Sequence, residues 1–92
     1  MTAAELKTFV KKSLRIVSNA FDDEIDALIE AGQKDITQAT DAAFDINDPV
    51  QCNAVAVYVQ AFFGYGDEKA AHRYKDMLQS IGLRKIKQVE QP

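Results

Sequence analysis

The chain has 92 residues, of which 47% are hydrophobic and 27% are charged, with a net charge of −3 and a single cysteine. This length allows one small domain and excludes a second independent core, and the balance of apolar and charged residues is that of a globular chain, not a disordered or fibrous one. The excess of acidic side chains argues against a general nucleic-acid coat, and one cysteine excludes both an internal disulfide and a zinc site built from several cysteines.

The first predicted helix begins at Thr2 and ends near residues 14–16. Thr2 and Glu5 have the spacing of a capping box, in which each side chain accepts a hydrogen bond from the other residue's backbone amide. The apolar residues that follow at helical spacing are Leu6, Phe9, Val10 and Leu14.

A second helix is predicted from about Asp22 to Thr40. Acidic residues crowd positions 22–26, where carboxylates favour a helix start because they oppose the positive end of the helix dipole. A single apolar stripe follows, which predicts a helix that faces the core. Its members are Ile25, Leu28, Ile29, Gly32, Ile36 and Ala39.

Residues 49–63 are predicted to form a buried central helix. Asp48-Pro49 is typical of a helix start, with aspartate as the cap and proline at the first helical position. From Val50 to Phe63 the segment is apolar nearly all round, and its length and its alanines favour a helix over a strand. Such a helix must be covered on several sides, and one side is a candidate for cover by another subunit.

Gly64-Tyr65-Gly66 predicts the end of this helix, and Asp67 is the predicted cap of a fourth. Gly82 is predicted to close the fourth helix, so that residues 83–92 follow as a short basic arm. The sequence therefore predicts an all-α fold, a compact bundle of about four helices around the central one. Residues 1–82 form its single domain, and residues 83–92 form a C-terminal arm.

Catalytic, metal and membrane functions find little support in the sequence. Cys52 is the only thiol and His72 the only imidazole, the first predicted to be buried and the second exposed. The acidic residues from Asp41 to Asp48 lack the spacing, the glycine and the glutamate of a calcium loop. No stretch approaches the roughly 20 apolar residues that cross a bilayer, and no signal-peptide core follows the first lysines. We expect no catalytic residue, metal, cofactor or membrane contact, and synthesis in a cytoplasm.

Basic and acidic residues are segregated along the chain. Residues 22–48 hold nine of the fourteen acidic residues, with Lys34 as their only base. Seven of the eleven basic residues lie toward the two ends: Lys7, Lys11, Lys12, Arg15, Arg84, Lys85 and Lys87. The simpler interpretation is that both groups are solvated faces. The alternative is a molecule with complementary faces that pair head to tail between copies and close into a ring.

Four motifs run in order along most of the chain. They are Leu6-x-x-x-Val10-Lys11-x-x-Leu14-Arg15-Ile16; Asp22-Asp23-Glu24-Ile25-Asp26-x-Leu28-Ile29-x-Ala31; Val50-x-x-x-Ala54-Val55-x-x-Tyr58; and Gly66-Asp67 leading to Tyr74-x-x-Met77-Leu78 and a basic tail. In this pattern of apolar spacing and turns the chain resembles the small head–tail connector, or adaptor, proteins of long-tailed bacteriophages and their prophages. It is shorter than many members of that family.

The resemblance implies a structural virion protein, not an enzyme. Such subunits form a ring of about a dozen copies beneath the portal and join it to the next head-completion or tail component. The genome DNA passes through the ring without sequence-specific binding. The expected location is the head–tail junction of the virion, and the host cytoplasm during assembly.

Two groups of residues are candidates for contacts with a neighbouring subunit or the portal. Near the N-terminus, Lys11, Lys12 and Arg15 are expected to meet Asp22, Asp23 or Asp26 of a neighbour. In the arm, the candidates are Leu83, Arg84, Lys85, Ile86, Lys87 and Val89.

Two other functions stay open at this point. The basic stretch from Lys7 to Arg15 is the motive for a small helical DNA-binding regulator, although the net charge is negative and no helix clusters the Arg, Asn or Gln of a recognition helix. An enzyme or cofactor carrier rests only on Cys52 and His72.

Overall fold

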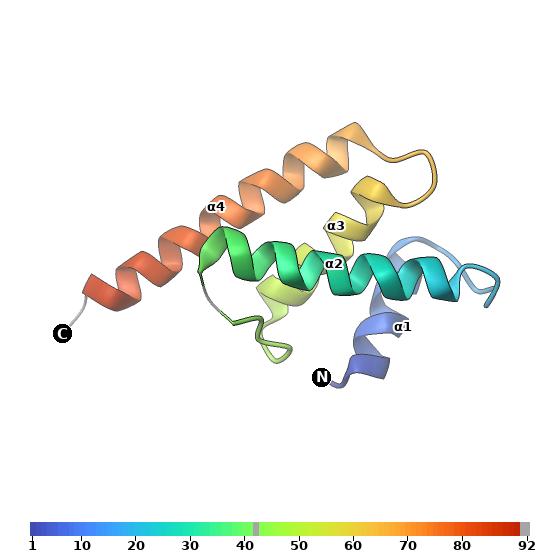
Figure 1. The fold of residues 1–92 in the computed structure, drawn as a ribbon, viewed down its shortest axis with the longest axis horizontal. Helices are drawn as coiled ribbons and strands as arrows, with labels where there is room; N and C mark the ends of the chain where they lie inside the picture. The colour runs from blue at the N-terminus through green and yellow to red at the C-terminus, as the bar shows by residue number, and fades with distance from the viewer. Residues whose placement is uncertain (42, 91–92) are drawn as a thin grey trace.

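A computed structural model describes the backbone of residues 1–41 and 43–90, and the side chains of residues 1–41 and 43–82. Over this part of the chain the fold consists of α1 (Ala3–Ser13), α2 (Asp22–Thr40), α3 (Pro49–Phe62) and α4 (Glu68–Glu90), with no strand (Figure 1). The prediction of an all-α bundle of about four helices is confirmed.

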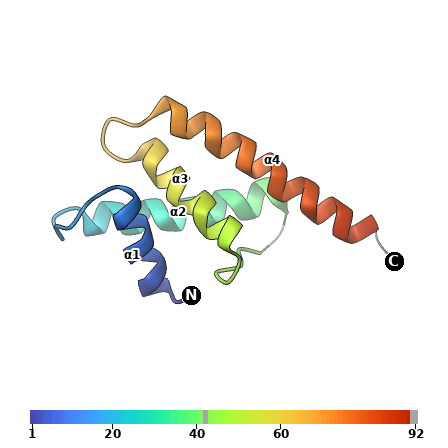
Figure 2. The same cartoon turned by 180° about the vertical axis from the view of Figure 1, so that it is seen from behind.

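Helix α3 is the centre of the bundle. It packs against α1, α2 and α4, whereas α1 and α4 make no contact with each other among the described residues. The two views of the ribbon show α1 and α4 on different sides of α3 (Figures 1 and 2). Half of the residues of α3 are buried: Cys52, Ala54, Val55, Ala56, Val57, Val59 and Ala61. The prediction of a buried central helix is confirmed.

The other three helices each present one apolar face to α3. The residues that they contribute to the buried core are Leu6, Val10, Ile25, Ile36, Ala70, Tyr74 and Ile81. Helix α2 approaches α3 closely at Gly32, where an added Cβ atom would lie 3.0 Å from Cδ1 of Tyr58. The glycine in the predicted stripe of α2 therefore lets the Tyr58 ring lie directly against the helix backbone.

All four helices begin where the sequence predicts, and three of them begin at a side-chain cap. Thr2 and Glu5 form the complete capping box of α1. Asp48 Oδ1 accepts a hydrogen bond of 2.9 Å from the amide of Val50, and Asp67 Oδ1 accepts one of 2.9 Å from the amide of Lys69. Helix α2 differs, because Phe21 at its N-cap forms no side-chain capping bond. The acidic first turn of α2 thus acts through charge on the helix dipole.

The prediction that Gly82 closes the last helix is wrong, since α4 continues to Glu90. Gly64 and Gly66 adopt the left-handed φ values of 62° and 82° that end α3, but Gly82 has no positive φ. The residues after Gly82 are mostly good helix formers, so nothing local forces the helix to stop. The predicted boundary between domain and arm falls within α4.

Replacing Gly82 with alanine is expected to raise the free energy of unfolding by about 0.5–1 kcal/mol. Alanine has the higher helix propensity, and an added Cβ would meet no atom within 4 Å. Urea denaturation followed by circular dichroism measures the change. Gly66→Ala is the matched control and is expected to lose stability, because its φ is left-handed and an added Cβ would lie 3.0 Å from the carbonyl oxygen of Ala61. A loss of stability in Gly82→Ala would place the end of the helix at Gly82 after all.

Candidate interaction surfaces

Three of the predicted contact residues, Lys11, Asp22 and Asp26, lie together where α1 meets the start of α2 in one and the same chain. Lys11 Nζ lies 2.8 Å from Asp22 Oδ1. Lys7 Nζ lies 3.1 Å from Asp26 Oδ2 and 3.4 Å from Asp22 Oδ2. Lys7 and Lys11 are one helical turn apart, so both reach the acidic first turns of α2. These charges are therefore paired within one subunit, whereas the sequence analysis expected them to pair between subunits.

The pairing shifts the pKa values of the groups involved. Hydrogen bonding from Lys11 lowers the pKa of the Asp22 carboxyl, and hydrogen bonding to Asp26 raises the pKa of the Lys7 ammonium. A carboxyl with a lowered folded-state pKa stabilises the fold above its ordinary pKa of about 4. This stabilisation is lost as the pH falls through the folded-state pKa.

Replacing Asp22 with asparagine is accordingly expected to weaken the dependence of stability on pH between neutral and acidic conditions. The measurement is the urea midpoint at neutral pH and near pH 3, both in low salt. The difference in midpoint between Asp22→Asn and the wild type should shrink in about 1 M NaCl, because salt screens exposed ion pairs. Asp23→Asn is the matched control, since Asp23 is exposed and forms no ion pair among the described residues. If Asp23→Asn altered the pH dependence of stability as strongly as Asp22→Asn, the ion pairs of Asp22 with Lys7 and Lys11 would not be the cause of that dependence.

The remaining N-terminal candidates, Lys12, Arg15 and Asp23, are exposed. None of them has an ion-pair partner within the described part of the chain. Arg15 follows the C-cap of α1 in a left-handed conformation, with a φ of 59°. The candidates Leu83, Arg84, Lys85, Ile86, Lys87 and Val89 belong to the last turns of α4, and their side chains lie outside the described residues.

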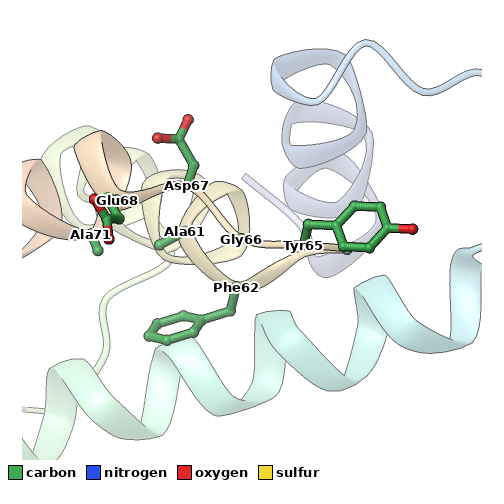
Figure 3. A pocket seen from close by; sticks show the side chains of 8 residues that line it. Ala61, Phe62, Tyr65, Gly66, Asp67, Glu68 and Ala71 are labelled. Carbon is green, nitrogen blue, oxygen red and sulfur yellow. The ribbon is translucent and has the colours of Figure 1, made fainter.

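Exposed aromatic rings mark the turn between α3 and α4, a feature that the sequence patterns did not single out. Phe62 is 53% exposed and Tyr65 is fully exposed. In Figure 3, the Phe62 ring points toward α2, whereas Tyr65 projects from the turn away from Phe62. The two rings lie beside a shallow hollow that Gly64, Gly66, Asp67 and Glu68 also line. The apolar character of residues 50–63 places Phe62 in a helix that needs cover on several sides. It does not show which side chains of that helix the bundle leaves exposed.

Beyond Phe62, a groove of about 260 Å³ runs between α2 and α4, and we call it the α2–α4 groove. The side chains that form it include Asp35, Tyr58, Phe62, Tyr74, Lys75 and Leu78. Tyr74 Oη donates a hydrogen bond of 2.5 Å to Asp35 Oδ2. Burial, together with this bond to a carboxylate, raises the pKa of Tyr74. The bond joins α4 to α2 beside the apolar side chains of Phe62 and Leu78.

The sequence reasoning missed this hydrogen bond. In the sequence, Tyr74 belongs to the apolar pattern of the fourth motif, and Asp35 lies off the apolar stripe of the second helix. The two residues are 39 positions apart, so no local spacing links them. The available signal was the hydroxyl itself, because a buried tyrosine usually finds a hydrogen-bond partner.

The two residues that suggested chemistry occupy ordinary structural positions. Cys52 is buried in α3, as predicted; its thiol donates to the carbonyl oxygen of Ile46 at 3.1 Å, and burial raises its pKa. A raised pKa keeps the sulfur in the weakly reactive thiol form. His72 is exposed on α4, also as predicted.

Among the described residues, no group of three or more His, Cys, Asp or Glu side chains is placed to hold a metal ion. Over the same residues, no helix combines the length and the apolar character needed to cross a bilayer. Comparison of the chain with protein families, with curated proteins and with solved structures finds no match.

Proposed function

We propose that the protein is a head–tail connector subunit of a bacteriophage or prophage. In this role it assembles as a ring of about a dozen copies beneath the portal and joins it to the next head-completion or tail component. The observation that carries the proposal is the ordered pattern of apolar spacing and turns over most of the chain, which resembles this family. The expected location is the head–tail junction of the virion.

Exposed apolar side chains support a role in assembly. Phe9, Phe62 and Tyr65 are 37%, 53% and fully exposed, although each belongs to or adjoins a helix that contributes to the core. A 92-residue bundle buries a smaller share of its surface than a larger domain does. Contacts with neighbouring subunits would cover these rings and add to a core that is small in the isolated chain.

Unpaired charges also support such a role. Lys12, Arg15 and Asp23 form no ion pair with described residues of the chain and remain available to a partner. The net charge of −3 suits a protein that surrounds DNA without retaining it, since negative charge repels phosphates.

Electron microscopy of the purified protein, alone and mixed with the portal protein encoded in the same genome, tests the proposal. We expect a monomer at low concentration and an added ring of density on the portal in the mixture. Light scattering across a range of concentrations gives the mass of the free species. A protein that stays monomeric at every concentration and leaves portal rings bare would contradict the proposal.

A DNA-binding regulator is the competing function, and the ion pairs of α1 weigh against it. Lys7 and Lys11 form ion pairs with Asp22 and Asp26. Of the basic residues from Lys7 to Arg15, this leaves chiefly Lys12 and Arg15 to bind phosphates. A gel-shift titration with duplex DNA at low salt separates the two functions. Salt-dependent binding in the micromolar range or tighter would favour the regulator.

A further inference from the structure

The side of α1 that faces away from α3 carries an exposed strip, which we call the α1 strip. Its residues, Met1, Ala4, Glu5, Thr8, Phe9 and Lys12, recur at intervals of three and four and line a shallow hollow. The buried residues Leu6 and Val10 lie on the opposite face of the helix. Met1 is 45% exposed and Phe9, at the border with the buried face, is 37% exposed, so the strip carries two apolar side chains open to solvent.

The α2–α4 groove lies on the other side of the bundle and has a matching composition. Phe62 is 53% exposed at its edge and contacts the ring of Tyr58, with the two ring centroids 4.7 Å apart. Asp35 and Lys75 flank this apolar floor. Because the described parts of α1 and α4 do not touch and the two helices pack on different sides of α3, the strip of a subunit does not lie against its own groove.

The charges on the two surfaces are complementary. The α1 strip carries Glu5 and Lys12 two helical turns apart, and the groove carries Asp35 and Lys75. Lys12 and Lys75 form no ion pair with the described residues of their own chain. Pairing Lys12 with Asp35 and Glu5 with Lys75 would bring opposite charges together, and Phe9, which lies between Glu5 and Lys12 on the helix, would then face the apolar floor of the groove.

From this match we propose that the α1 strip of one copy docks in the α2–α4 groove of the next, an inference that rests on the proposed ring-forming function. The contact is heterologous, since it joins two different surfaces, and repeated contacts of this kind generate a closed ring when the rotation between copies permits. The two surfaces are lined by only six and seven residues, against the roughly 20–30 per partner of a stable complex. A single contact is therefore weak, and the ring is stable only when it closes or when the portal holds many copies together.

Site-directed disulfide formation tests the contact. Cys52 is first replaced by alanine, and Phe9→Cys and Phe62→Cys are introduced into separate proteins. These are mixed, concentrated and oxidised, with and without portal rings. The expected result is a dimer joined by a bond between positions 9 and 62, identified by mass spectrometry, whereas each protein alone remains largely unlinked. Ser80→Cys, exposed on the opposite side of α4 from Leu78, replaces either partner as the control and is expected to give no such dimer.

The charge match has its own matched control. Adding Lys12→Glu to the Phe9→Cys protein is expected to lower the yield of dimer several-fold, because that copy supplies its strip. The same substitution in the Phe62→Cys protein is expected to leave the yield unchanged, since that copy supplies only its groove. Circular dichroism confirms that each variant is folded before oxidation.

The outcomes separate this inference from the proposed function. Rings on the portal without a bond between positions 9 and 62 would overturn the docking mode and leave the connector function standing. The predicted bond in a protein that never binds portal would support the docking mode and count against that function. Phe9→Cys dimers that form as readily without a partner would indicate a symmetric contact and overturn the inference, as would the absence of both bond and ring.

Discussion

Replacing Leu6 with alanine is expected to lower the free energy of unfolding by about 2–5 kcal/mol. Leu6 is 1% exposed and forms, with Val10, the buried face of α1. Among the described helices, α1 packs only against α2 and α3, and Leu6 belongs to the face that makes this contact. A small domain has a total stability of only about 5–15 kcal/mol, and the substitution therefore removes a large share of it. Urea denaturation followed by circular dichroism measures the loss.

Phe9→Ala is the matched control for Leu6→Ala, because it removes a larger side chain from the same helix at a position that borders the buried face and does not belong to the buried core. Phe9 lies in the α1 strip and is 37% exposed, and its loss is expected to cost less than about 1 kcal/mol. Leu6→Met keeps the volume of the core and is expected to cost less than about 1.5 kcal/mol. Equal losses from Leu6→Ala and Phe9→Ala would show that α1 does not pack through the face described.

The elements that the sequence predicted correctly are those defined by local chemistry. The bounds of α2, Asp22 to Thr40, follow from an acidic first turn and one apolar stripe. The caps Thr2, Asp48 and Asp67 bond the amides that their positions predict. These signals depend on neighbours within about one turn, which the sequence contains in full.

Gly82 shows where local chemistry is insufficient. A glycine after an apolar stripe is typical of a helix end, but glycine is also tolerated inside a helix at a cost of about 1 kcal/mol. Only its φ distinguishes the two, and the sequence does not specify it. The sequence around Gly66 indicates a helix end more strongly, because Gly64 precedes it and the capping residue Asp67 follows.

The candidate contact residues show a second limit of sequence reasoning. Lys11 and Asp22 attract each other equally well within one chain or between two, so charge alone did not decide where they pair. The packing of α1 beside the start of α2 settles it, and that packing depends on Leu6, Val10 and Ile25 in the core. For the same reason the sequence did not show that Phe9 and Phe62 would remain exposed.

Replacing Tyr74 with phenylalanine is expected to lower the free energy of unfolding by about 1.5–3 kcal/mol, the range for a hydrogen bond to a charged group. The substitution keeps the buried ring but removes the hydroxyl that donates to Asp35. The half-buried carboxylate then loses its donor while most of its surroundings stay apolar. Tyr65→Phe is the matched control: Tyr65 is fully exposed, and loss of its hydroxyl is expected to change stability by less than about 0.5 kcal/mol.

The same pair predicts how stability changes at alkaline pH. Burial and the Asp35 carboxylate raise the pKa of Tyr74, so the folded protein holds this proton more tightly than the unfolded chain does. The contribution to stability is complete below the ordinary tyrosine pKa of about 10 and is lost as the pH rises above it. Urea midpoints between about pH 8 and pH 11 should therefore fall steeply in the wild type and in Tyr65→Phe, and less steeply in Tyr74→Phe. Some dependence remains in that variant, because burial also raises the pKa of Tyr58. An unchanged slope in Tyr74→Phe would mean that the link between α2 and α4 does not depend on the protonated hydroxyl of Tyr74.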